Sequence, residues 1–176
     1  MKKILAFAGS NSSESINHKF LEALEPCFSE HYQLVSLRDF EAPLFGVDLK
    51  NSEGVPESMI RLSELMQEAD GLIVSAAEHN GSMTAVLKNT FDWLSILNPK
   101  FFLFKPTLFL STSPGGRGGK SVLNHLTEIM PHRGAEIVGS FGLGNFHENY
   151  VEGSLSTVVL EEVQPLIIQL EEAIKR

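Results

Sequence analysis

Short apolar runs alternate along this chain with longer segments in which apolar residues recur every three or four positions. The wholly apolar run at 4–8 and the continuous run at 71–76, apolar except for Ser75, are typical of strands covered on both faces of a parallel sheet. Further strands are expected at 33–37, 106–112 and 135–140. The helical spacing between these runs predicts helices that bury one face against the sheet.

Five helices are expected to follow these strands, within residues 15–28, 56–66, 82–94, 122–130 and 157–175. Ser82 is expected to cap the third of them. Pro165 must lie in the first turn of the last helix or kink it, because proline lacks the N–H that a helix interior needs. Residues 38–55 combine proline and glycine without helical spacing and are expected to be irregular.

The alternation of strands and helices predicts one α/β domain, residues 1–176, with a five-stranded parallel sheet and helices on both faces. Ligands of such sheets bind beyond the carboxyl ends of the strands. Three loops are therefore candidates for a binding site: 9–17, 76–81 and 111–119.

Composition narrows the possible partners and the location. The net charge of −8 argues against nucleic acid or an acidic membrane surface as a partner. No run approaches the ~20 apolar residues of a membrane span. Cys27 is the single cysteine and cannot form an internal disulfide, so a reducing, cytoplasmic location is expected.

The stretch SPGGRGGKS, residues 113–121, looks like the end of a nucleotide P-loop. The motif G-x-x-x-x-G-K-[ST] needs glycine at position 114, where this chain has Pro114, and no strand ends in a convincing acid for magnesium. ATP or GTP hydrolysis is therefore disfavoured. Four glycines among residues 115–119 exceed what a connection needs, and they favour a backbone that approaches a ligand closely.

The loop GSNSSESIN, residues 9–17, carries several hydroxyl groups just before a helix. Helix N-termini present unpaired N–H groups and bind anions, so Ser10, Ser12 and Ser15 favour a phosphate. Capping alone would need only one hydroxyl, from Ser13 or Ser15. The loop has neither the T-x-T-G-x-T spacing of flavodoxin electron carriers nor the G-x-G-x-x-G of dinucleotide folds.

The third loop places Glu78, His79, Asn80 and Gly81 between an apolar strand and a helix. Backbone amides beside Asn80 and Gly81 can follow the edge of a flat heterocycle. Trp93, in the helix that follows, is interpreted as a core aromatic residue.

Together these loops resemble the NADPH-dependent FMN reductase family, which includes quinone, azo and chromate reductases. The first loop is similar to the family motif G-S-x-R-x-x-S-x-N, and the third to P-E-Y-N-x-S-x-x-x-x-L-K-N-x-x-D-W-L-S. STSPGGRGG is similar to the family's loop beside the flavin ring. The matching residues are Gly9, Ser10, Ser15, Asn17, Glu78, Asn80, Ser82, Leu87, Lys88, Asn89, Asp92, Trp93, Leu94 and Ser95. The chain departs from the motifs at three positions, with Ser12 for arginine, Ala77 for proline and His79 for tyrosine.

The resemblance implies a flavodoxin-like three-layer sandwich with strand order 2-1-3-4-5, acting as an FMN-dependent oxidoreductase. A hydride would pass from NADPH or NADH through flavin N5 to a small acceptor such as a quinone, an azo compound, a metal oxyanion or free flavin. Hydride transfer requires no side-chain acid or base, so neither a catalytic residue nor a metal is expected. The resemblance also implies a homodimer or tetramer, for which segments 38–55 and 141–153 are candidate surfaces.

The resemblance further implies which residues hold FMN. The phosphate is expected at the first loop, and the ring between 78–81 and 113–116. The expected cofactor-binding residues are Ser10, Ser12, Ser15, Ile16, Asn17, Ala77, Glu78, His79, Asn80, Gly81, Ser113, Pro114, Gly115 and Gly116. Arg117 is a candidate for contact with the phosphates of NADPH.

Two other functions stay open. A flavodoxin-type carrier would pass single electrons to a partner protein, and a flavin-binding relative could lack reductase activity. A phospho-accepting receiver domain needs an acidic cluster after the first strand and an aspartate ending the third. The chain has Gly9, Ser10 and Ala76 at those places, so this class is nearly excluded.

Overall fold

A computed structural model describes every residue of the chain, from 1 to 176. Five parallel strands form its central sheet, in the spatial order β2-β1-β3-β6-β7. The strands are β1 (Lys3–Gly9), β2 (His31–Ser36), β3 (Gly71–Ala76), β6 (Lys105–Thr112) and β7 (Ala135–Leu143). Counted along the chain this order is 2-1-3-4-5, so the predicted flavodoxin-like sheet is confirmed.

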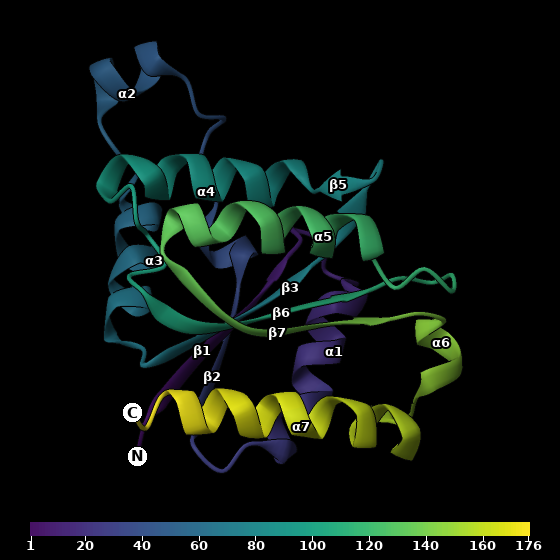
Figure 1. Cartoon of the computed structure of the whole chain (residues 1–176). Coiled ribbons are helices and arrows are strands. Elements are labelled where there is room, and N and C mark those ends of the chain that lie inside the picture. Colours follow the sequence, from purple (N-terminus) through teal and green to yellow (C-terminus); the bar gives the residue numbers. More distant parts are fainter.

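Helices cover both faces of the sheet (Figure 1). One face carries α3 (Glu57–Glu68), α4 (Ala85–Leu97) and α5 (Lys120–Ile129), and the other carries α1 (Ile16–Leu24) and α7 (Thr157–Ala173). Alternate residues of each strand point to opposite faces, so the sheet separates two apolar cores. Leu5 and Phe7 of β1 pack in one core, and Ile4 and Ala6 pack in the other.

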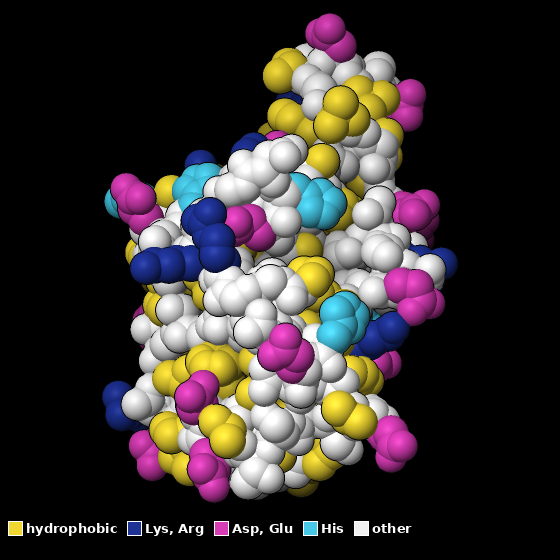
Figure 2. Space-filling view, turned by 90° about the vertical axis from the view of Figure 1, so that its right-hand side faces the viewer, with side chains coloured by type: hydrophobic (Ala, Val, Ile, Leu, Met, Phe, Trp, Pro, Cys, Tyr) yellow, Lys and Arg dark blue, Asp and Glu magenta, His cyan; other side chains and the backbone are white.

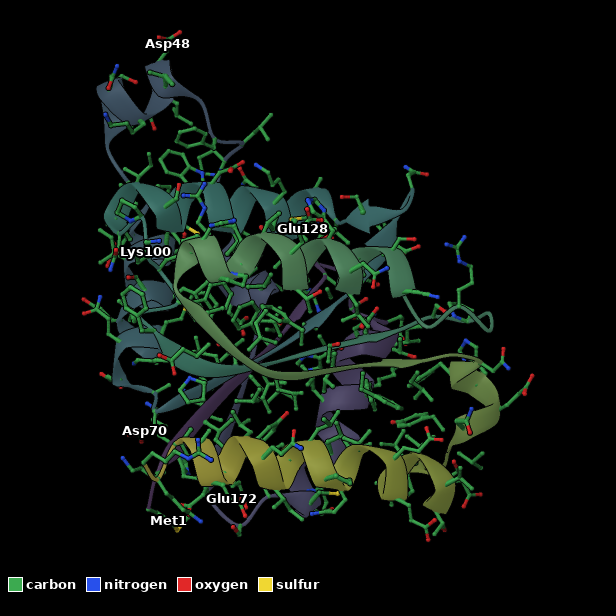
Figure 3. All side chains as sticks on the ribbon, in the orientation of Figure 1. Met1, Asp48, Asp70, Lys100, Glu128 and Glu172 are labelled. Carbon is green, nitrogen blue, oxygen red and sulfur yellow. The ribbon has the colours of Figure 1, made fainter.

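The two segments that are candidate partner surfaces contain regular structure, including residues 38–55, which were expected to be irregular. Residues 38–55 include most of a 3₁₀ turn, η2 (Leu37–Phe40), and a short helix, α2 (Val47–Glu53). Helix α2 projects from the body of the molecule, with Asp48 near its far end (Figures 1 and 3). Residues 141–153 contain the end of β7 and α6 (Phe146–Asn149), and the hairpin of β8 (Tyr150–Val151) and β9 (Ser154–Leu155) begins there.

One prediction about a helix end was wrong, and one of the two placements expected for Pro165 is excluded. Thr84, not Ser82, caps α4, and its side chain accepts the N–H of Leu87 at 3.2 Å. Ser82 belongs instead to a short hairpin of β4 (Glu78–His79) and β5 (Ser82–Met83). Pro165 lies inside α7, well past its first turn. None of the helices has the length and apolar character needed to cross a membrane.

The remaining short elements are 3₁₀ turns, η1 (Glu25–Cys27) and η3 (Met130–Arg133). Pro26 lies in the turn η1 that follows α1, so the first predicted helix is shorter than its apolar spacing suggested.

Candidate functional site

The loops after β1, β3 and β6 all lie at the carboxyl edge of the sheet, on the side that faces the viewer in Figure 2. Gly9 pairs with Ala76 in the parallel register of β1 and β3. The first and third candidate loops therefore leave the sheet side by side. This arrangement brings the predicted site residues to one edge of the molecule.

Asn17 ties the first of these loops to β6. Its side-chain Oδ1 accepts the N–H of Thr112 at 3.0 Å and the hydroxyl of Ser75 at 2.8 Å. Its Nδ2 donates to the Thr112 carbonyl at 3.2 Å. Asn17 is 2% exposed, and its Oδ1 and Nδ2 both bond within the protein, so its main-chain N–H is the group that we expect to meet a ligand.

Two further hydrogen bonds connect the remaining loops. The hydroxyl of Thr84 donates to the carbonyl of Gly9 at 2.8 Å, which holds the start of α4 against the end of β1. The Oε2 atom of Glu78 accepts the N–H of Val122 at 2.9 Å, which holds the β4–β5 hairpin against the first turn of α5. The Glu78 carboxylate is thus a structural anchor between two of the loops.

The first loop folds into a compact turn with its hydroxyl groups near the surface. Ser10 Oγ accepts the N–H of Ser12, and Ser15 Oγ accepts the N–H of His18 as the N-cap of α1. The main-chain N–H groups of Ile16 and Asn17 follow directly in the first turn, where no intrahelical acceptor exists. This is the arrangement of donors that binds a phosphate.

A polar cavity of about 560 Å³ opens beside these serines, and no hydrophobic residue lines it. Its only arginine, Arg38, comes from η2 and was not among the residues predicted for the site. Lys19 is not free to serve the same loop, because its ammonium bonds Glu14 at 2.7 Å and this bond lowers the pKa of Glu14. The Arg38 guanidinium has no hydrogen-bond or ion-pair partner, unlike Lys19. The lining residues are Ser10, Ser12, Ser13, Ser15, His18, Glu22, Ser36, Arg38, Asp39 and Glu41.

Asn80 and Gly81 form the turn of the β4–β5 hairpin. Their φ values are 53° and 77°, and positive φ at both central residues defines a type I′ turn, for which Asn-Gly is the preferred pair. This signal was present in the sequence. The turn presents His79, Asn80 and Gly81 to solvent, with Ala77 partly buried at its base.

The glycine-rich loop after β6 is ordered by its own hydrogen bonds. Ser113 Oγ donates to the Gly115 carbonyl at 2.8 Å and accepts the Gly118 N–H at 2.9 Å. The Gly115 carbonyl also accepts the N–H of Asn145 at 3.0 Å. Pro114, Gly115 and Gly116 are exposed, so this loop offers a rigid backbone to solvent.

The four glycines of this loop divide into two kinds. Gly118 and Gly119 have φ values of +58° and +69°, and a Cβ on Gly118 would lie 2.7 Å from the carbonyl of Gly142. These two are required by the fold. No atom lies within 4 Å of a Cβ placed on Gly115, which faces open space, whereas one on Gly116 would make an ordinary contact with Asn145 Oδ1 at 3.7 Å.

The long motif on α4 serves the fold rather than the ligand edge. Asn89 accepts the N–H of Phe45 at 2.7 Å and donates to the carbonyls of Ala42 and Pro43. Trp93 is fully buried, as expected, and its indole N–H donates to the Pro43 carbonyl at 2.8 Å. These residues hold the segment that carries α2 against the body.

The edge carries no pair of groups arranged for side-chain acid–base catalysis. His125 Nδ1 lies 3.4 Å from Ser82 Oγ, a long contact without a carboxylate to orient the imidazole. No group of three His, Cys, Asp or Glu side chains gathers anywhere in the chain in a way that could hold a metal. The arrangement is suited to binding through backbone and hydroxyl groups.

Comparison with known proteins agrees with this geometry. Residues 2–148 match the family model described as NADPH-dependent FMN reductase. A quinone reductase of Escherichia coli K12 is 32% identical over 131 residues, covering 73% of this chain and 69% of that protein. An NAD(P)H-dependent FMN reductase of Pseudomonas aeruginosa is 32% identical over 133 residues, with the same coverage of 73% and 69%. Among solved structures, the flavoenzyme NAD(P)H:(acceptor) oxidoreductase FerB of Paracoccus denitrificans shares the fold, with a TM-score of 0.81, 22% identity and coverage of 99% and 98%.

Proposed function

The chain belongs to the NADPH-dependent FMN reductase family, and we propose that it binds FMN across its three edge loops and passes electrons from NAD(P)H to a small acceptor. One observation carries this proposal. The bonds Asn17–Thr112, Thr84–Gly9 and Glu78–Val122 tie all three loops into one preformed binding edge. Such preorganisation lowers the entropic cost of binding a cofactor.

The residues of the first loop fit the phosphate of FMN. The hydroxyls of Ser10, Ser12 and Ser15 and the main-chain N–H groups of Ile16 and Asn17 supply donors to it. The adjoining cavity has no apolar lining, which suits a doubly charged group. Ser12 stands where the family motif has arginine, and the Arg38 guanidinium supplies the missing positive charge from the neighbouring strand end.

The flavin ring is proposed to lie between two backbone segments. Ala77–Gly81 borders one edge, with the hairpin turn supplying amides, and Ser113–Gly116 borders the other. The open space at Gly115 fits a flat ring close to the main chain. Because both segments are exposed, one ring face stays accessible to nicotinamide and then to the acceptor.

The two-electron chemistry of the reaction is supplied by the flavin when it is bound. The chain's own part is to fix the phosphate, hold the two backbone segments in place and leave one side open. We propose a quinone, an azo compound, a metal oxyanion or free flavin as the acceptor, in line with relatives named quinone reductase and NADPH azoreductase. His79 replaces the family's tyrosine beside this opening and is proposed to influence the choice of acceptor.

The test is an absorption spectrum of the purified protein with and without added FMN, followed by anaerobic NADPH or NADH. Binding of FMN and bleaching of the flavin band, with reoxidation by a quinone, is the expected result. Absence of FMN binding contradicts the proposal. Binding without any oxidation of NAD(P)H favours the electron carrier or a relative without reductase activity.

We also propose that the chain forms a homodimer through the segments 38–55 and 141–153. Both carry large apolar side chains in solvent: Leu44 is 80% exposed, Val47 63% and Val151 63%. Exposed apolar residues grouped on projecting segments often mark interaction surfaces. A molar mass near twice 19.4 kDa by light scattering supports the dimer, and the monomer mass contradicts it.

A further inference from the structure

A second cavity, of about 240 Å³, lies on the far side of the glycine-rich loop, between α5 and the edge strand β7. Arg117 and Lys120 line it together with the polar side chains of Asn124 and Ser140. No acidic residue is among its lining residues. The cavity is therefore a concave, positively charged feature on a chain whose net charge is −8.

The charges of Arg117 and Lys120 are not taken up within the protein. Five lysines of the chain form ion pairs with carboxylates, whereas these two residues form none within 4 Å. Arg117 donates one hydrogen bond, to Ser121 Oγ at 3.1 Å, which orients the guanidinium and leaves its other donors free. The nearby Glu78 carboxylate is engaged with the N–H of Val122.

The position of this cavity relates it to the proposed flavin site. Arg117 directly follows Gly116, the last residue of the segment proposed to border the ring. The face at the carboxyl ends of the strands carries a close group of Lys and Arg side chains on one side (Figure 2). A molecule that stacks on the exposed ring face and extends past the glycine-rich loop reaches this cavity next.

We propose that Arg117 and Lys120 form an anion subsite for a phosphate group of the dinucleotide reductant. This inference rests on the proposed function and adds to it a site for the adenylate half of NAD(P)H. Arginine matches phosphate oxygens with paired donors, and lysine adds a compact charge. Asn124 and Ser140 provide neutral donors. The phosphate is either the pyrophosphate, present in both reductants, or the 2′-phosphate, present in NADPH alone.

The subsite also addresses a problem of charge. NADPH is strongly anionic, and a protein of net charge −8 repels it at long range. A local basic cavity focuses the field and attracts the anion at short range. Because salt screens the long-range repulsion and the local attraction alike, the gain in association rate due to Arg117 and Lys120 should shrink as salt is added.

The test compares the double variant Arg117→Gln/Lys120→Gln with a matched control, Arg133→Gln/Lys100→Gln, in the FMN-loaded protein. The control removes the same charges at exposed or partly exposed positions away from this cavity. We expect the KM for NADPH to rise about tenfold or more in the first variant, as for loss of charged hydrogen bonds, and to stay unchanged in the control. The difference in kcat/KM between the first variant and the wild type should also shrink as salt is added.

The second reductant identifies the phosphate. If the KM for NADH rises equally, the subsite binds the pyrophosphate, and if only that for NADPH rises, it binds the 2′-phosphate. If the variant keeps the wild-type KM for NADPH and the wild-type KM for NADH, the inference is overturned.

Binding of nucleotides without turnover separates this inference from the proposed function. Calorimetric titration with 2′,5′-ADP and ADP, and with 5′-AMP for comparison, measures the subsite directly. Weaker binding of 2′,5′-ADP or ADP to the double variant supports it, and unchanged binding overturns it. Failure of the wild type to bind FMN or oxidise NAD(P)H counts against the proposed function and is recorded independently of these titrations.

Discussion

The side-chain amide of Asn17 bonds both main-chain polar groups of Thr112, although 95 positions separate the two residues. Its Nδ2 donates to the carbonyl at 3.2 Å and its Oδ1 accepts the N–H at 3.0 Å. The amide therefore completes the hydrogen bonding where β6 leaves the sheet. Because Asn17 lies in the first turn of α1, the same contact fixes the proposed phosphate loop relative to the proposed ring loop.

Asn17→Ala should destabilise the fold more than the replacement of a polar residue usually does. It leaves the N–H and C=O of Thr112 and the hydroxyl of Ser75 buried without their partner. We expect the free energy of unfolding to fall by about 2–4 kcal/mol, since each unsatisfied buried group costs roughly 1–3 kcal/mol. Urea unfolding followed by circular dichroism measures the change.

Asn11→Ala is the control for this experiment, because Asn11 is exposed in the same loop. It should change the free energy of unfolding by less than about 0.5 kcal/mol. Equal stability of the two variants would show that Asn17 does not anchor the helix to the sheet.

The arrangement of the sheet follows from the sequence because its physical cause is local. The run 4–8 is apolar at every position and 71–76 at every position except Ser75, which is the pattern that a strand covered on both sides requires. The strand boundaries at 33–37 and 135–140 differ from β2 and β7 by a few residues, since strand ends depend on neighbouring strands. The position of the three loops at the carboxyl edge was predicted from the same local pattern, because each loop begins where an apolar strand ends.

The contacts that shape the site could not be read from local pattern. Thr84 replaces Ser82 as the cap because its hydroxyl also reaches the Gly9 carbonyl, a contact across 75 positions. Arg38 joins the serine cavity only because β2 lies beside β1. Single-sequence spacing contains no information about such partners.

Substitution by alanine should lower the stability of the fold at Gly118 and leave it nearly unchanged at Gly115. In Gly118→Ala the new methyl group meets the Gly142 backbone at 2.7 Å in a left-handed conformation, so the fold should lose about 2 kcal/mol or more. In Gly115→Ala nothing lies within 4 Å, so stability should stay within about 0.5 kcal/mol of wild type. Thermal unfolding of both variants measures this difference.

The affinity for FMN completes the comparison of these glycines. If the backbone at Gly115 borders the flavin ring, Gly115→Ala should weaken FMN binding despite its normal stability. Unchanged affinity for FMN in a stable Gly115→Ala protein would contradict the proposed position of the ring.

Asp70 should make stability depend on pH at the amino edge of the sheet, far from the loops (Figure 3). Its carboxylate accepts the N–H of Lys3 at 2.8 Å and the ammonium of Lys2 at 3.0 Å, and these bonds lower its pKa. A lowered pKa stabilises the folded state above the unfolded value of about 3.9. That contribution is lost as pH falls from there through the folded pKa.

Asp70→Asn should therefore be less stable than wild type at pH 7, and the difference should shrink as pH falls below about 4. Urea unfolding of both proteins at pH 7 and again below about pH 4 tests this expectation. Asp48→Asn, on the exposed helix α2, serves as control and should show no such dependence. A gap between Asp70→Asn and wild type that is constant with pH would show that its charge is not responsible.

Arg38 should be the residue that compensates for Ser12 in holding the FMN phosphate. Both line the same cavity, in which Glu22, Asp39 and Glu41 are the acidic groups and His18 lies 3.6 Å from Glu22. Without the guanidinium, neither arginine nor lysine would line the cavity to offset these carboxylates. Arg38→Gln should therefore weaken FMN binding about tenfold or more, the loss expected of one charged hydrogen bond.

Riboflavin lacks the phosphate, so its affinity should be the same in wild type and Arg38→Gln, as measured by quenching of flavin fluorescence. Arg133→Gln removes an equal charge outside this cavity and should leave FMN affinity unchanged. The double change Ser12→Arg/Arg38→Gln should restore FMN binding, because the family's arginine returns to the loop. Equal loss for FMN and riboflavin, or no recovery in the double variant, would mean that Arg38 acts on the shape of the cavity and not on the phosphate charge.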